Sequence, residues 1–458
     1  MTKFYTILSS ALLSALFISC EKNVNSDEEK QQKVNEYIHA VMKDYYLWNG
    51  NVPDEPAGAE VEPSGYFYSL LDAGDAWSYI TDEKEKFLEE EINYTGETFG
   101  YDLSFGRFTG SEALFAVVNY VYPGSPAALA GLKRGDFILE VDGATLVMDN
   151  YTELYASGTR QLSLGTLDGE RVTAAGSVTL ASVKMEQNPV LAREVLTRGT
   201  NKIGYLLYVG FVNNFEQELV DALTAFKAEG ITDLVLDLRY NPGGGVDVTT
   251  LLCSALVPPA AMTAGNVLIH HLWNAPLQAY LEAAEREAPG TFAAALATRF
   301  REVEYNLALP RERVYVLTSR GSASASELLV VGLEAYMDVV QVGDSTRGKY
   351  TAMMEFSPTE KELANWLLLP VVYKFANRDG KTDFKEGLPP DYLLKETLPF
   401  KTLGTTDDPL LAKAVELITG EEVPAAEPEE NRVTWLSLPS PRVTDGRLLH
   451  KPAIPAMK

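Results

Sequence analysis

The sequence predicts an α/β protein core with an inserted β-rich module and an N-terminal helical segment. Three observations lead to this prediction. In the C-terminal half, apolar strand-like runs such as Ile203–Val209 and Leu234–Leu238 alternate with amphipathic helical patterns such as Phe215–Ala228, which is typical of helices packed on a sheet. Residues 96–185 consist of short strand-like runs separated by turn residues. Residues 33–95 carry apolar residues at helical spacing.

The N-terminal segment starts with one clear amphipathic pattern. Val34, Ile38, Val41 and Tyr45 recur at three- and four-residue spacing, which places them on one face of a helix. A stretch rich in proline and glycine, residues 52–65, then interrupts the pattern. We therefore expect several short helices rather than one long helix.

The β-rich module, residues 96–185, is predicted from runs with strand composition. Leu114–Val118 and Phe137–Val141 are apolar and β-branched or aromatic, and Asp142-Gly143 is a typical hairpin turn after the second run. Between the two runs we expect a turn, one short helix and a second turn.

The core, residues 186–420, continues the alternation. The strand Val314–Leu317, the helix Glu327–Tyr336 and the strand Val339–Gly343 follow one another in the sequence. Residues 275–306 are rich in alanine and charge, which predicts a helical insertion or lid. A further helix is expected at Pro409–Ile418, before a tail, 421–458, that is rich in proline and glutamate and expected to be loosely ordered.

Composition excludes some partners. The chain has 458 residues, with 39 basic and 64 acidic side chains and a formal charge of −25. Nucleic acids and anionic lipid surfaces select basic patches, so neither is expected to bind this chain. No HExxH pair and no GxSxG turn occurs, and nothing calls for a metal or an organic cofactor.

The N-terminus predicts export. Lys3 precedes the apolar run Ile7–Ile18, which is too short to cross a bilayer and suits a signal peptide. The run ends in Leu-Phe-Ile-Ser before Cys20, which resembles the lipobox of bacterial lipoproteins, with phenylalanine where leucine is usual. The resemblance implies a signal peptide, 1–20, acylation of Cys20, a tether, 21–32, and a location in the cell envelope. The alternative is an ordinary secretory signal with an incidental cysteine.

Ser324 lies where a strand leads into a helix. A hydroxyl there lies beside free backbone N–H groups and the positive end of the helix dipole, which suit a developing oxyanion. The alternative is that Ser324 only caps the helix, as small polar residues at helix starts usually do. Lys349 follows the next strand, 25 positions later, and loops after successive parallel strands meet at one edge of a sheet. A neutral lysine in an apolar pocket can take the proton of a serine hydroxyl.

A glycine-rich loop follows the strand that ends at Leu238. Gly243, Gly244 and Gly245 permit positive φ angles and close approach of the backbone, so that N–H groups can point at a substrate carbonyl. A phosphate-binding loop is the alternative, but the lysine and hydroxyl of a P-loop are missing.

The β-rich module, residues 96–185, resembles a PDZ domain. The phrase PGSPA…AGLKRGDFILEVDG, in residues 123–143, carries the resemblance. It implies binding of extended peptides, often C-terminal ones, along a sheet edge. The carboxylate-binding loop would be Phe99-Gly100-Tyr101. The alternative is a PDZ domain that serves only as a spacer.

Several motifs together resemble the S41 family of serine peptidases, the tail-specific or C-terminal processing proteases. The motifs span about residues 35–420 and are, in chain order, Trp77-Ser78-Tyr79, the PDZ-like phrase, LDLRYNPGGG, SASASE, VGDSTRGK and GLPPDY. The resemblance implies a crotonase/ClpP-like α/β core. Position by position it also implies site residues: a nucleophile at Ser324, a general base at Lys349, oxyanion donors at Ala325 and at Gly243 or Gly244, and a supporting acid at Glu327.

Two positions depart from the family pattern. Members with GKGxxQ orient the lysine with the glutamine, whereas Lys349 is followed by Tyr-Thr-Ala-Met, and an aspartate of some members is Ala335 here. The orienting role would fall to Glu327 or to a backbone carbonyl. A histidine base finds little support, because the histidines lie outside the matched motifs; they are His39, His270, His271 and His450.

The resulting expectation is a lipid-anchored serine endopeptidase of the cell envelope that acts on polypeptides, whose C-terminal segments the PDZ domain would present. The alternative from another class is a peptide-binding scaffold lipoprotein with a decayed site, and the missing glutamine is its best support. A glycan- or lipid-active hydrolase with the same dyad has no positive feature in the sequence. The oligomeric state is left open.

Overall fold

The computed structural model describes residues 27–107, 111–168, 171–423 and 434–435. Cys20, with the expected signal peptide and the first part of the tether, lies outside the described residues. Residues 27–32, which we expected in the tether, instead open helix α2 (Asp27–Tyr45). Asp27, Glu28 and Glu29 occupy the first turn of this helix, where their negative charge complements the helix dipole and favours a helix over a tether.

The core is built on a six-stranded sheet in the order β10-β11-β12-β15-β16-β20. β11, β12, β15, β16 and β20 run parallel to one another, and β10 pairs antiparallel with β11. The strands are β10 (Val190–Arg198), β11 (Asn201–Tyr208), β12 (Asp233–Asp237), β15 (Arg313–Thr318), β16 (Asp338–Gly343) and β20 (Tyr392–Leu393). The predicted α/β fold class is confirmed.

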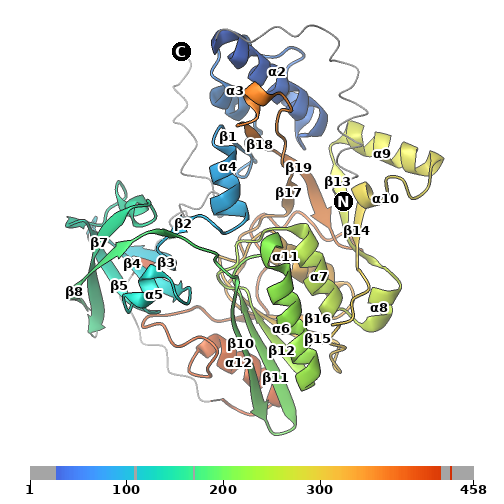
Figure 1. Cartoon of the computed structure of the whole chain (residues 1–458). Helices are drawn as coiled ribbons and strands as arrows, with labels where there is room; N and C mark the ends of the chain where they lie inside the picture. Colours follow the sequence, from blue (N-terminus) through green and yellow to red (C-terminus); the bar gives the residue numbers. More distant parts are fainter. Residues whose placement is uncertain (1–26, 108–110, 169–170, 424–433, 436–458) are drawn as a thin grey trace.

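Helices cover both faces of this sheet (Figure 1). Leu234 and Leu236 of β12 pack in one cluster with α6 (Glu216–Glu229), α7 (Val246–Leu256) and α11 (Ala325–Glu334). Val235 points the other way and packs in a second cluster with α12 (Pro409–Thr419). Because both faces are covered, the strands read as continuous apolar runs rather than alternating ones.

A second, four-stranded antiparallel sheet has the order β14-β13-β19-β17. Its strands are β13 (Val267–Trp273), β14 (Ala297–Arg299), β17 (Thr351–Met353) and β19 (Val371–Ala376). The prediction that residues 275–306 form a helical insertion was therefore wrong in part. Helices α9 (Ala275–Glu287) and α10 (Ala293–Leu296) are present, but β14 pairs with β13, because tertiary pairing overrides the helical propensity of an alanine-rich segment.

The β-rich module forms a third sheet in the order β21-β3-β4-β5-β7-β8, with β6 (Ala144–Thr145) paired to β5. The strands are β3 (Tyr101–Arg107), β4 (Leu114–Val121), β5 (Phe137–Val141), β7 (Thr159–Asp168), β8 (Arg171–Ala181) and β21 (Thr434–Trp435). Helix α5 (Pro126–Leu129) and the 3-10 turn η3 (Tyr151–Leu154) pack with it. β21 belongs to the tail that we expected to be loosely ordered, yet it pairs antiparallel with β3.

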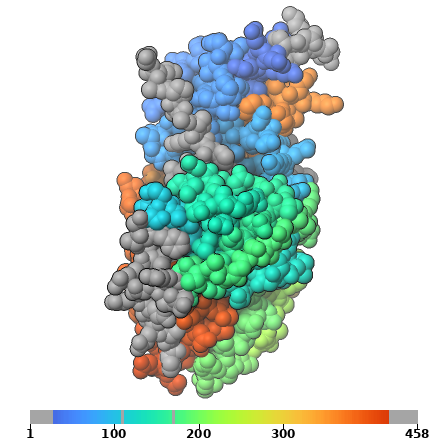
Figure 2. Space-filling model, turned by 90° about the vertical axis from the view of Figure 1, so that its left-hand side faces the viewer, coloured from blue at the N-terminus to red at the C-terminus, as the bar shows by residue number. Residues whose placement is uncertain are grey.

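The N-terminal helices lie at one end of the molecule, beside residues near 360 (Figures 1 and 2). They comprise α2, α3 (Pro63–Ser69) and α4 (Lys84–Phe87), with turns η1 (Asn49–Asn51) and η2 (Leu88–Ile92). The short strand β1 (Tyr79–Thr81) pairs with β18 (Leu367–Leu369), and β2 (Glu97–Thr98) pairs with β9 (Val183–Lys184). η5 (Lys361–Leu363) completes the elements. Within the described part of the chain, no helix is long and apolar enough to cross a membrane.

Candidate active site

Ser324 stands at the N-terminal end of α11, in a backbone conformation that an ordinary helix cap does not need. Its φ and ψ are 54° and −108°. A cap normally takes extended angles, as Ser125 does before α5, with φ −70° and ψ 162°. A non-glycine residue with this φ is strained, and such strain is found most often at functional sites. Ser324 is also partly accessible, while its neighbours Ala323 and Ala325 are buried.

The Glu327 carboxylate joins the serine loop to the lysine loop. One oxygen, Oε2, accepts the backbone N–H groups of Ser324 and Lys349, both at 2.8 Å. The other, Oε1, accepts the Gly348 N–H and the Thr346 hydroxyl, both at 2.6 Å. The two backbone nitrogens of Ser324 and Lys349 therefore lie within twice 2.8 Å of each other. The serine loop and the lysine loop are therefore close in space, as we expected from the order of the strands.

Glu327 is shielded from solvent. The residue is fully buried, and burial raises the pKa of its carboxyl group, while the four hydrogen bonds act in the opposite direction. All four donors point at the carboxylate, so the ionised form satisfies them with its oxygen lone pairs. Glu327 therefore fixes the backbone of the lysine loop and also caps α11.

Lys349 lies in a loop that a neighbouring segment holds in place. The lysine is 5% exposed. Before it, Gly348 has a φ of 98°, and a Cβ there would lie 2.1 Å from the Lys385 carbonyl oxygen, so that only glycine fits. Thr346 and Leu388 exchange two hydrogen bonds: the Thr346 N–H donates to the Leu388 carbonyl oxygen, and the Leu388 N–H donates to the Thr346 hydroxyl. The segment around Leu388 includes the GLPPDY motif, whose role in holding the lysine loop we had not predicted.

The glycine loop lies directly against the nucleophile loop. A Cβ on Gly243, whose φ is 111°, would lie 2.8 Å from the Ser324 Cβ and 3.0 Å from the Ala325 nitrogen. Asn241 fastens the two loops, because its carbonyl oxygen accepts the Ala323 N–H and the Ser326 hydroxyl. The close approach explains why a residue with a side chain cannot replace Gly243.

The predicted oxyanion donors differ in their availability. The Gly243 N–H donates to the Asn241 side-chain oxygen at 2.9 Å. Among the described residues, no acceptor is found for the N–H groups of Gly244 and Ala325. Ala325 is the first residue of α11, where N–H groups lack partners within the helix. The N–H groups of Gly244 and Ala325 are therefore available to an additional acceptor, whereas that of Gly243 is engaged.

The predicted peptide-binding loop of the β-rich module lies at the start of β3. Phe99 and Tyr101 have buried side chains, and the Gly100 N–H donates to the Thr98 hydroxyl at 3.0 Å. The Gly100 carbonyl accepts the Tyr122 N–H. Peptide recognition here would thus involve the β3 backbone, since these two aromatic side chains belong to the module's core.

A polar network that the sequence analysis missed connects the β-rich module to the glycine loop. Arg134 donates to the Tyr240 hydroxyl at 2.8 Å and pairs with Glu396, and the Tyr240 hydroxyl donates to Glu396 at 2.6 Å. Burial would raise the pKa of Glu396, but the guanidinium groups of Arg134 and Arg239 outweigh it and lower that pKa. Arg134 and Arg239 each lay in a quoted motif, whereas nothing near Glu396 marked it as their partner.

Among the described histidines, His271 of β13 makes structural contacts. His271 is buried, its ring nitrogens contact the Ala295 carbonyl oxygen and the Thr298 hydroxyl, and its ring stacks on Tyr373. Burial is the main cause that lowers its pKa from the ordinary 6.5 to about 4. These contacts give His271 a structural role.

His271 should make folding stability sensitive to acid. Because its pKa is lower in the folded protein, the unfolded chain binds the proton first as the pH falls. Stability is then fully present above pH 6.5 and declines as the pH falls toward about 4, by roughly 3 kcal/mol in total. Urea unfolding at several pH values should show this slope reduced in His271→Gln. Equal slopes in His271→Gln and wild type would contradict the assignment.

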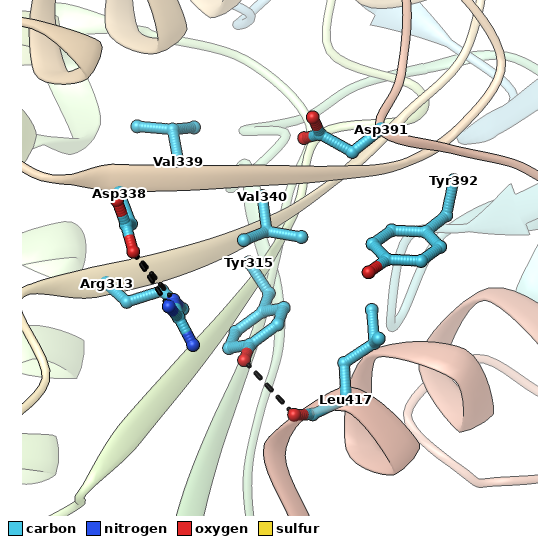
Figure 3. A pocket seen from close by; sticks show the side chains of 8 residues that line it. All are labelled: Arg313, Tyr315, Asp338, Val339, Val340, Asp391, Tyr392 and Leu417. Carbon is cyan, nitrogen blue, oxygen red and sulfur yellow. Dashed lines mark hydrogen bonds and ion pairs between the residues drawn. The ribbon is translucent and has the colours of Figure 1, made fainter. Parts of the chain in front are cut away.

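A hollow of about 380 Å³ lies elsewhere on the core (Figure 3). Arg313 and Asp338, at the starts of β15 and β16, form an ion pair at its rim, and the Tyr315 hydroxyl points to the Leu417 carbonyl. Ser324 and Lys349 follow the opposite, carboxyl ends of these two strands. The hollow is therefore separate from the candidate site.

The described residues include no cluster of three histidine, cysteine, aspartate or glutamate side chains suited to a metal ion.

Comparison with known proteins agrees with this architecture. The model of peptidase family S41 matches residues 202–394, and the model of the S41 N-terminal domain matches residues 33–79. The chain belongs to peptidase family S41. A PDZ domain model matches residues 117–157, within the β-rich module, so the resemblances to S41 peptidases and to PDZ domains are confirmed.

Relatives of this S41 protein carry the names of processing proteases. It is 25% identical to the carboxy-terminal processing protease CtpA of Bacillus subtilis over 412 residues, which cover 86% of this chain and 77% of the relative. It is 26% identical to the carboxyl-terminal-processing protease of Synechocystis over 343 residues, covering 73% and 72% of the two chains. A solved structure described as an S41 protease from Bacteroides fragilis is 25% identical, with a TM-score of 0.66, covering 88% of this chain and 99% of that one.

Proposed function

We propose that this S41 protein is a lipid-anchored endopeptidase of the cell envelope that hydrolyses polypeptides with a Ser324–Lys349 dyad. One observation carries the proposal: a single carboxylate, that of Glu327, accepts the backbone N–H groups of both residues. A strained, partly accessible serine at a helix start and a buried lysine are thereby held side by side at the carboxyl edge of the sheet.

The reaction follows from these positions. The Ser324 hydroxyl oxygen attacks the scissile carbonyl carbon while its proton passes to the neutral Lys349 amine. The carbonyl oxygen becomes an oxyanion, which the N–H groups of Ala325 and Gly244 can bind. The Lys349 ammonium then returns the proton to the leaving amine, and the peptide C–N bond breaks. A water molecule, deprotonated by the same amine, hydrolyses the acyl-enzyme and restores Ser324.

The substrate class is inferred from the relatives and from the PDZ domain. The relatives are named for carboxy-terminal processing, and PDZ domains bind extended peptides along a sheet edge. We infer that C-terminal segments of polypeptides are presented by the PDZ domain.

The proposed lipid anchor rests on Cys20, which follows the apolar run. Mass spectrometry of the N-terminus of the exported protein would test it. A diacylated Cys20 is expected, and an unmodified Cys20 would contradict the anchor.

Turnover separates this proposal from a peptide-binding scaffold with a decayed site. The purified protein, assayed without added metal, is expected to cut an unfolded polypeptide into discrete fragments, followed by mass spectrometry. Binding of the polypeptide without any fragments would favour the scaffold. The missing glutamine after Lys349 supports that alternative, but the intact serine, lysine and glycine loops favour the enzyme.

The chain's own tail is expected to compete with peptides. β3 follows the predicted peptide-binding loop, and its side away from β4 already pairs with β21, Thr434 opposite Arg107 and Trp435 opposite Gly106. Deleting residues 424–458 should therefore lower the Kd for a labelled peptide with a free C-terminal carboxylate by several-fold. Fluorescence anisotropy in the Ser324→Ala background would measure it. Deleting only 436–458, which keeps β21, is the matched control, and an unchanged Kd in the longer deletion would contradict the competition.

A further inference from the structure

A tryptophan from the N-terminal helical segment contacts the candidate base. The Lys349 Nζ lies over the ring of Trp77, 5.1 Å from its centroid. The two residues are 272 positions apart in the sequence. A distance of this size is within the range in which an ammonium group is attracted to the face of an indole ring. Trp77 lay in a motif that supported the family resemblance, but nothing in the sequence connected it with Lys349.

The turn that carries Trp77 is held rigidly. Asp75, which is 1% exposed, accepts the backbone N–H groups of Trp77 and Ser78 at 2.8 and 2.9 Å, and its other oxygen accepts the Tyr46 hydroxyl at 2.9 Å. The Ser78 hydroxyl in turn accepts the Val371 N–H at 2.8 Å. Val371 opens β19, which pairs with β17, the strand that starts two residues after Lys349. The turn is thus fixed to the same sheet that positions the lysine.

We propose that Trp77 is the positioning residue for Lys349, so that the N-terminal helical segment completes the active site. The inference rests on the proposed Ser324–Lys349 dyad. The Glu327 carboxylate holds the backbone N–H of Lys349, which leaves the direction of the side chain to other contacts. The indole face constrains the position of Nζ, and in this chain it takes the place of the glutamine that other family members have after the lysine.

The ring also favours the charged form that arises during the reaction. When the Ser324 O–H bond breaks, a new N–H bond forms on Nζ, and the amine becomes an ammonium ion. An ammonium ion interacts with the indole face more strongly than a neutral amine does, so the contact strengthens as the tetrahedral intermediate forms. Removal of the ring should therefore lower kcat more than it raises KM.

The alternative is that Trp77 only packs in the N-terminal core. It does border a cluster that includes Val371 and Leu368, and Trp366 borders the same cluster. Trp366 is partly buried like Trp77, and no lysine lies over its ring in the described contacts. Trp366→Leu is thus a control of the same residue type in the same core.

Kinetics with an unfolded polypeptide would test the inference, with Trp77→Leu, Trp77→Phe and Trp366→Leu compared in the full chain. We expect a roughly ten-fold lower kcat and an unchanged KM for Trp77→Leu, with substantial recovery in Trp77→Phe, which keeps an aromatic face. Trp366→Leu should keep the wild-type kcat. Thermal unfolding of each variant shows whether it is folded.

Two outcomes would overturn the inference. One is a wild-type kcat in folded Trp77→Leu. The other is an equal loss in Trp77→Leu, Trp77→Phe and Trp366→Leu together with lower unfolding temperatures, which indicates core packing. Ser324→Ala and Lys349→Ala, measured in the same assay, distinguish this from failure of the proposed function. If they retain wild-type activity the dyad itself is wrong, and if only they are inactive the dyad stands without Trp77.

Discussion

Ser324→Ala and Lys349→Ala should each lower kcat for an unfolded polypeptide by a factor of about 10⁴ or more. The first change removes the attacking oxygen and the second the group that takes its proton, and residues that act as a unit lose nearly the whole effect when either is removed. The residual rate would come from substrate binding and from the N–H groups near Ala325 and Gly244. Fragment formation, quantified by mass spectrometry over time, measures the loss.

The lysine offers a sharper variant than alanine. Lys349→Arg places a cation at this position, but a guanidinium does not give up its proton near neutral pH and cannot accept one, so the variant should be about as inactive as Lys349→Ala. Lys385→Ala, an exposed lysine on the adjoining loop, should retain wild-type kcat. Activity in folded Lys349→Arg close to wild type would show that the residue serves as a charge and not as a base.

The second large effect is expected at Glu327. In Glu327→Gln one carboxylate oxygen becomes an NH₂ group, which faces N–H or O–H donors where an acceptor stood. Donors left unsatisfied in a fully buried position should lower the free energy of unfolding by on the order of 3 kcal/mol. Because the same hydrogen bonds hold the serine and lysine loops together, kcat should also fall by more than about 10².

Glu334→Gln is the matched control for Glu327→Gln. Glu334 ends the same helix and pairs with Lys381 at the surface, where an ion pair contributes little. It should change neither urea unfolding nor kcat measurably. If Glu327→Gln unfolded at the wild-type urea concentration and kept its kcat, the carboxylate would not be the clamp that its four hydrogen bonds suggest.

Local patterns allowed much of the core to be predicted. The runs at Ile203–Val209 and Leu234–Leu238 correspond to β11 and β12, which are buried on both faces and therefore apolar throughout. Ser324 was placed at a strand-to-helix junction, where it lies before α11. We expected Glu327 or a backbone carbonyl to orient the lysine, and this stays a prediction: the Glu327 carboxylate accepts the backbone N–H groups of Gly348 and Lys349.

Contacts between distant segments could not be predicted in the same way. Trp77 meets Lys349 and Arg134 meets Glu396 only because separate elements pack together, and neither pair leaves a periodic signal in the sequence. The alanine-rich composition of residues 275–306 predicted helix. The strand β14 within this segment forms because it pairs with the edge of β13, which the composition does not indicate. The positive φ of Ser324, beside the closely packed Gly243, likewise has no signal in the sequence.

The most direct test of the Ser324–Lys349 dyad is the site of covalent modification by a serine-directed phosphonate. The purified protein would be treated with the phosphonate, digested and examined by peptide mass spectrometry. The dyad predicts one adduct, on Ser324, formed at least a hundred-fold more slowly in folded Lys349→Ala, since the hydroxyl then lacks a base. A modification that spares Ser324, or equal rates in wild type and Lys349→Ala, would contradict it.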